Sequence, residues 1–86
     1  MSPEQLLVVA REFCRYHPSV RMERYWALNA AAAAAGARVE GVFVHGSAAA
    51  AAKALSETIR AVQPLSGRNA EFAEVCGEVY RRLAEG

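Results

Sequence analysis

Residues 30–47, which read AAAAAAGARVEGVFVHGS, decide the fold that we expect for this chain. The six alanines are typical of a helix, and Gly36 directly after them is a common helix end. Positions 39 and 42–44 carry β-branched or aromatic residues, which favour an extended strand. Ser47 then supplies the N-cap of a further helix. The stretch therefore predicts a helix, a strand over 38–45, and a second helix.

Two amphipathic helices are predicted after this strand, over 47–62 and 69–85. In the first helix the apolar residues share one face, and Pro64 follows its end. In the second helix apolar residues recur at steps of four, three and four residues, with acidic residues early and basic residues late, as suits the helix dipole. We expect these two helices to pack against each other through Leu55, Ile59, Phe72 and Val79.

A third helix is predicted over 19–35, and it carries two apolar faces. Val20, Ala27, Leu28 and Ala31 form one face, whereas the other face is formed by Met22, Trp26 and Ala33. A helix with two apolar faces lies either at the centre of a fold or at a subunit interface.

Residues 5–10 support two different structures. The apolar run over 6–10 is consistent with a short buried strand, which would pair with 38–45 in a β-α-β unit. Ser2 and Gln5, on either side of Pro3, instead have the spacing of a capping box at the start of a helix. The main prediction is a helix-dominated α/β fold whose sheet is completed by oligomerisation. The alternative is an all-α domain of four helices.

Length and composition limit the possible architectures and partners. The 86 residues predict a single domain over 1–86. Of the 46 hydrophobic residues that the 53% share represents, 19 are alanine, so we expect a small core and self-association as a homodimer or a higher oligomer. Because the net charge is only +1, we do not expect a nucleic acid as the main partner. No stretch is long enough to span a membrane, and a cytoplasmic location is expected.

Few residues have the spacing of a chemical site. The two cysteines, Cys14 and Cys76, fit neither a disulfide framework nor a zinc site, and we expect no metal and no cofactor. His45, Gly46 and Ser47 lead from the predicted strand into a helix, where free backbone N–H groups can bind an anion. The simpler interpretation of these three residues is that Gly46 turns the chain and Ser47 caps the helix.

One segment resembles a known family. The alanine-rich helix, Gly36 and the 39–44 run resemble the helix–strand signature of sulfur-relay subunits of the DsrE/TusD type. The resemblance implies a flavodoxin-like sheet in which Leu6–Ala10 is the first strand. It also implies that Cys76, ahead of Arg81 and Arg82, is an acceptor cysteine that carries sulfur as a persulfide.

Three functions are therefore expected, in descending order. The first is a small, non-catalytic, self-associating interaction module, which can also bind an unknown protein partner. The second is a sulfur carrier that uses Cys76 as its catalytic residue. The third is a DNA binder of the ribbon-helix-helix type, in which residues 38–44 would pair with the same strand of a second chain.

Overall fold

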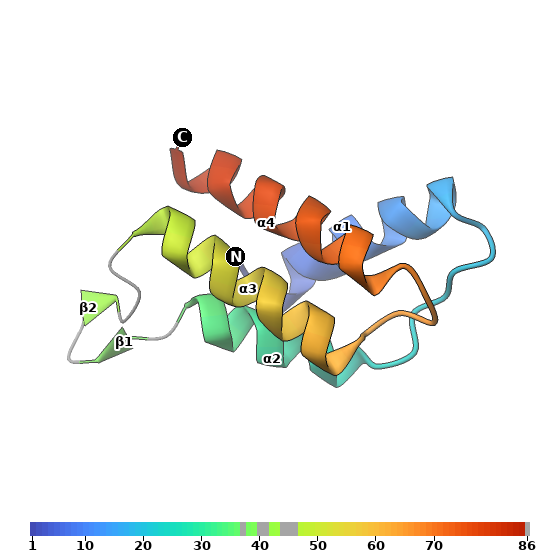
Figure 1. Cartoon of the computed structure of the whole chain (residues 1–86), viewed down its shortest axis with the longest axis horizontal. Coiled ribbons are helices and arrows are strands. Elements are labelled where there is room, and N and C mark those ends of the chain that lie inside the picture. The colour runs from blue at the N-terminus through green and yellow to red at the C-terminus, as the bar shows by residue number, and fades with distance from the viewer. Residues whose placement is uncertain (37, 40–41, 44–46, 86) are drawn as a thin grey trace.

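Four helices dominate the part of the chain that the computed structural model describes, namely residues 1–36, 38–39, 42–43 and 47–85 (Figure 1). The helices and two short strands follow one another as α1 (Pro3–Tyr16), α2 (Tyr25–Ala35), β1 (Arg38–Val39), β2 (Val42–Phe43), α3 (Ala48–Val62) and α4 (Asn69–Glu85). The prediction that helices dominate is confirmed. The arrangement fits the all-α alternative rather than the α/β fold.

The predicted strand over 5–10 is wrong, because these residues lie inside α1. The Ser2 backbone N–H donates to Gln5 Oε1 (2.8 Å), and the Gln5 N–H donates to Ser2 Oγ (3.1 Å), so the capping box forms in full. Leu6, Ala10 and Phe13 then fall on one helical face and are buried. Local capping and helical burial therefore outweigh the β preference of the valines.

The predicted single strand over 38–45 is also wrong in its form. Residues 38–39 and 42–43 are extended, as predicted, but they pair antiparallel with each other, with Arg38 opposite Phe43 and Val39 opposite Val42. The remaining positions, 40–41 and 44–45, lie outside the described residues. Neither the β-α-β unit nor the flavodoxin-like sheet is present in the described residues, since α1 occupies the place of its first strand.

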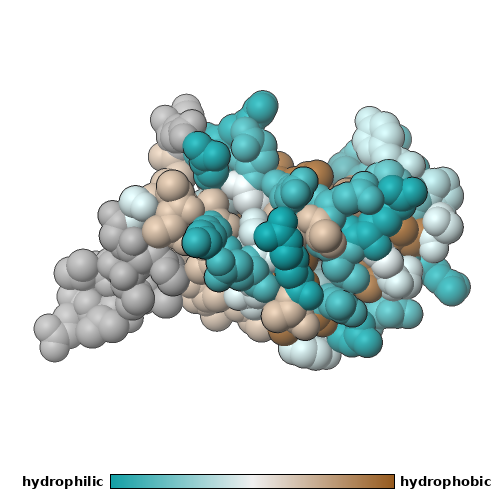
Figure 2. Space-filling model, in the orientation of Figure 1, coloured by the Kyte–Doolittle hydropathy of each residue, from teal (hydrophilic) through white to brown (hydrophobic). Residues whose placement is uncertain are grey.

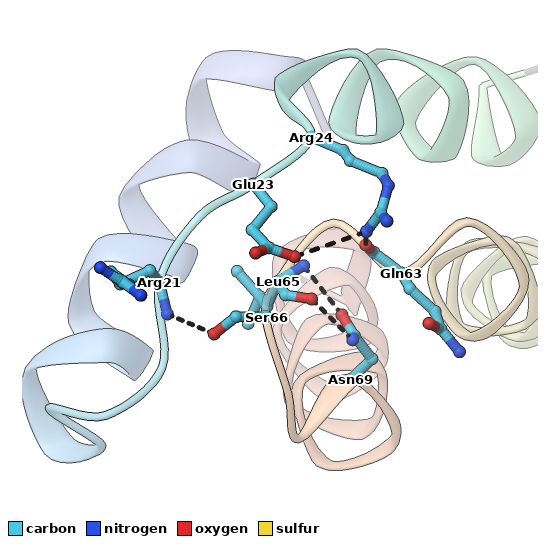
Figure 3. Close-up of polar contacts among 7 residues, drawn as sticks. All are labelled: Arg21, Glu23, Arg24, Gln63, Leu65, Ser66 and Asn69. Carbon is cyan, nitrogen blue, oxygen red and sulfur yellow. Dashed lines mark hydrogen bonds and ion pairs between the residues drawn. The ribbon is translucent and has the colours of Figure 1, made fainter.

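The predicted helix over 19–35 begins six residues late, at Tyr25. Gly36 ends it as expected, and its backbone N–H donates to the Ala32 carbonyl (3.0 Å). The segment ahead of it is held by the α3–α4 connection instead (Figure 3). The Ser66 N–H donates to the Arg21 carbonyl (2.8 Å), and the Arg21 N–H donates to Ser66 Oγ (2.9 Å).

Further bonds extend this pairing of the two loops. The Pro64 carbonyl accepts from the N–H groups of Glu23 (2.9 Å) and Arg24 (3.0 Å), and the Arg24 Nη1 donates to the Gln63 carbonyl (2.7 Å). Residues 21–24 therefore direct their backbone hydrogen bonds to a segment about forty residues away, and a helix there would break them.

The helices α3 and α4 have the bounds predicted for them. Ser47 Oγ accepts from the Ala50 N–H (3.1 Å), which confirms Ser47 as the N-cap of α3. Leu55, Ile59 and Phe72 are fully buried in the core between α3, α4 and α1, as predicted, whereas Val79 is only half-buried.

The helix α1 completes the fold by packing against both α2 and α4 (Figure 1). It runs antiparallel to α4. The ring centroids of Phe13, near its end, and Phe72, near the start of α4, are 5.4 Å apart. Met1 and Gln5 lie at the other end of this pair, beside Tyr80 and Leu83.

Candidate functional site

An open groove of about 670 Å³ runs along the outer side of the α1–α4 pair. Val8 and Tyr16 of α1 form one wall, and Val75 and Val79 of α4 form the other. Phe13, which is buried, lies between the two walls. The groove is therefore lined mainly by apolar side chains from two neighbouring helices.

The walls of this groove leave large apolar side chains in contact with solvent. Val8 is 59% exposed, Tyr16 80% and Val75 40%, and Leu83 further along α4 is 57% exposed. Figure 2 shows hydrophobic surface between hydrophilic side chains in the upper part of the view, where α1 and α4 lie. An apolar patch with a polar rim is typical of an interaction surface.

Three carboxylates lie at one end of the groove, where α1 ends and α4 begins. They belong to Glu12, Glu71 and Glu74. Each makes one ion pair with an arginine at or beyond the rim: Glu12 with Arg15 (2.9 Å), Glu71 with Arg68 (3.0 Å) and Glu74 with Arg60 (3.6 Å). All six side chains are about half exposed or more, so these ion pairs are weak and can rearrange.

His17 also borders this end of the groove. It is the C-cap residue of α1, and its backbone N–H donates to the Phe13 carbonyl (3.1 Å). The centroids of the two rings are 4.6 Å apart, so the imidazole extends the aromatic floor.

Cys76, the predicted acceptor cysteine, lies on the buried stripe of α4 that adjoins the groove wall. It is fully buried in the core, and this burial raises the pKa of its thiol to about 12. The thiol is therefore protonated at neutral pH, whereas the thiolate is the reactive form of cysteine. Arg82, one of the two arginines that follow Cys76 in the sequence, donates from Nε to Glu78 at 3.1 Å and is exposed.

The predicted anion site falls mostly outside the described residues, since these do not include His45 and Gly46. Ser47 is described, and its hydroxyl oxygen already accepts the Ala50 N–H as the α3 cap. The cap interpretation of Ser47 is thus confirmed, and binding of an anion at 45–47 stays a prediction.

The outer face of α2 is a second exposed apolar surface. Tyr25 is 61% exposed and Trp26 58%, and Ala33 also faces solvent. One of the two apolar faces predicted for 19–35 is therefore covered within the chain, through Ala27, Leu28 and others, while the Trp26 face is left open.

The groove was not foreseen from the sequence, although a signal for it exists. Val75, Val79 and Leu83 recur every four residues along α4, beside the buried Phe72 and Cys76 stripe. Such spacing gives the helix a second apolar stripe that adjoins the first. Val79 was predicted to lie in the core between the last two helices, and the structure instead places it in the groove wall beside α1.

Comparisons with known protein families, with curated proteins and with solved structures gave no match. Within the described residues, no helix combines the length and apolar character that crossing a bilayer requires.

Proposed function

We propose that this chain is a small, non-catalytic, self-associating interaction module, and that the α1–α4 groove is the surface through which it associates. The observation that carries the proposal is the exposure of Val8, Tyr16 and Val75 around one groove. Of the six large hydrophobic side chains exposed in the described residues, four belong to α1 and α4.

A helix is the element that such a groove accommodates. Two antiparallel helices with apolar walls between them present the surface that an amphipathic helix covers in helix-in-groove recognition. Tyrosine is among the residues that contribute most to binding at such surfaces. A small domain with a thin, alanine-rich core also gains stability from association, because binding to the folded state shifts the folding equilibrium.

Light scattering at micromolar concentration tests this proposal. The natural chain is expected to be a dimer or larger, and Val75→Glu to weaken its association at least tenfold, since the change places a charge in the apolar wall. Val75 is partly exposed, so the variant should keep its helical circular dichroism. The matched control is Ala33→Glu on the exposed face of α2, which should leave association unchanged.

Two results would overturn the proposal. The first is a natural chain that stays monomeric at these concentrations. The second is a reversed pattern, in which Ala33→Glu dissociates the oligomer and Val75→Glu does not, since this pattern would move the interface to the outer face of α2.

The two other predicted functions gain no comparable support. A sulfur carrier would need the buried Cys76 thiol to reach a donor, so that function stays a prediction that requires an opening of the core. A ribbon-helix-helix DNA binder would need residues 38–44 to pair with a second chain. In the structure, residues 38–39 and 42–43 pair with each other.

A further inference from the structure

The exposed face of α4 is divided by charge along its length. Three of its four acidic residues belong to its first ten positions, at Glu71, Glu74 and Glu78, and the basic ones follow at Arg81 and Arg82, ahead of Glu85 at the helix end. Val75 and Val79 lie between these two ends. The helix is therefore acidic over its first half and apolar in the middle, and it carries a net charge of +1 over its last turns, from two arginines and one glutamate.

The carboxylates that line the groove beside this face gather at one end. Glu12, Glu71 and Glu74 gather where α1 ends and α4 begins. The opposite end is formed by the start of α1 and the last turns of α4. A helix that enters the groove with its basic residues toward the three carboxylates is favoured over one that enters in the reverse direction.

We infer that the occupant of the groove is α4 of a second copy of this chain, which lies antiparallel to the first α4 about a two-fold axis that crosses the groove at the level of position 77 along the helix. This inference rests on the proposed function, because it assigns the partner and the orientation at the same groove. In this arrangement Arg81 and Arg82 of each copy approach the three carboxylates of the other. The surface is self-complementary, as a two-fold interface requires.

The apolar residues agree with the same register. A two-fold axis at position 77 sets Val75 of one copy opposite Val79 of the other, so the two apolar centres coincide. Because α1 is antiparallel to α4, it is parallel to the incoming helix, and Glu12 then lies on the side of the incoming arginines. A parallel arrangement of the two α4 helices would instead place carboxylates against carboxylates and arginines against arginines.

Cross-linking distinguishes the two orientations. In the antiparallel register position 71 of one copy lies opposite position 83 of the other, while the two copies of position 71 are separated by roughly 18 Å along the helix, at 1.5 Å per residue. Glu71→Cys and Leu83→Cys are both exposed positions, so neither change disturbs the core. Cys14 is replaced by alanine, and the buried Cys76 stays in place.

With a short bis-maleimide, the double variant E71C/L83C should form a covalent dimer in high yield, and each single variant should not. Within one helix the two positions are too far apart to be bridged, so the product of the double variant is intermolecular. Lys53→Cys, on the exposed side of α3, is the control for random collision and should give no dimer.

Each other outcome has a definite meaning. If the single variants cross-link with themselves while the natural chain is dimeric by light scattering, the proposed function stands and the antiparallel orientation is wrong. If the natural chain is dimeric and no variant cross-links, the interface does not involve α4, and this inference is overturned. A monomeric natural chain would instead overturn the proposed function itself.

Discussion

The two sides of α4 have very different surroundings. On the side that faces α3, a Cβ atom added to Gly77 would lie 2.5 Å from Ser56 Oγ, so the packing of the two helices leaves no room there for a larger residue. Ser56 Oγ also donates to the Ala73 carbonyl (2.9 Å) across this contact. On the side toward the groove, Val75 is 40% exposed and borders open space beside α1.

The difference shows how a helix with two adjacent apolar stripes is used in a small chain. Small residues let α3 approach and bury one stripe, which stabilises the fold. The second stripe needs another helix, and α1 covers only part of it. The closed side of α4 therefore serves stability, and the open side is available for association.

The largest expected difference between the two helices that line the groove is in thiol reactivity. Cys14 of α1 is half-buried, whereas Cys76 on the closed side of α4 is fully buried. At pH 7 iodoacetamide should alkylate Cys14 first and Cys76 on the order of a thousandfold more slowly, because Cys76 reacts only through unfolding of a domain stable by at least about 5 kcal/mol. Mass spectrometry of timed samples measures both rates. Rapid alkylation of Cys76 would contradict the burial of this side of α4 and would support the sulfur-carrier function.

The raised pKa of Cys76 also predicts a pH dependence of stability. Its ordinary value is 9.0 and its value in the fold is about 12. Because the folded state holds the proton more tightly, the contribution is fully present below pH 9 and is lost as the pH rises from 9 to 12. Urea unfolding of the natural chain and of Cys76→Ala, measured between pH 9 and 12, isolates the contribution of this thiol to the free energy of unfolding. If the free energies of the two proteins depend on pH in the same way, the raised pKa of Cys76 is wrong.

Truncation of a side chain on each side of α4 compares the two sides directly. Phe72→Ala should lower the free energy of unfolding by about 3–5 kcal/mol, since it empties a fully buried site. Val75→Ala should change it by less than about 0.5 kcal/mol in the monomer, because this side chain is partly solvated. Urea denaturation at low protein concentration gives both values. Equal effects would mean that the groove is closed in solution.

The close contact at Gly77 predicts that the effect of Gly77→Ala on stability depends on whether residue 56 is serine or alanine. Gly77→Ala should destabilise the natural chain by about 1–3 kcal/mol, because the new methyl group collides with the Ser56 hydroxyl. In a Ser56→Ala background that collision is absent, and the higher helix propensity of alanine, about 1 kcal/mol, should make the same change neutral or stabilising. If Gly77→Ala costs the same in both backgrounds, the two helices are not as close as described.

The last expected loss of stability concerns the connection between α3 and α4, on the closed side. Asn69 Oδ1 accepts the Leu65 N–H (3.0 Å), and Asn69 Nδ2 donates to the Leu65 carbonyl (3.0 Å) (Figure 3). Asn69→Ala should cost about 1 kcal/mol by thermal unfolding. Asn69→Asp keeps the acceptor and loses the donor, so its cost should be smaller. An unchanged melting temperature for Asn69→Ala would show that these two bonds contribute nothing.

Sequence alone was sufficient for the parts of the fold that depend on neighbours a few residues apart. The cap at Ser47, the end of α2 at Gly36 and the burial of Leu55, Ile59 and Phe72 were all predicted. Each depends on a hydrogen bond within one turn, or on the spacing of apolar residues along one helix. The Ser2 cap was recognised as well, but the apolar run over 6–10 supported a strand equally well. Only the burial of Leu6, Ala10 and Phe13 on one helical face decides for the helix.

The tertiary structure decided the rest, because the interactions involved join residues far apart in the chain. Residues 21–24 leave the predicted helix for bonds to Pro64 and Ser66, and helix propensity cannot anticipate partners some forty residues away. The groove likewise exists only because α1 lies beside α4 and covers only part of its second apolar stripe. A sequence pattern shows that a stripe is apolar; which stripe stays open depends on where the other helices pack.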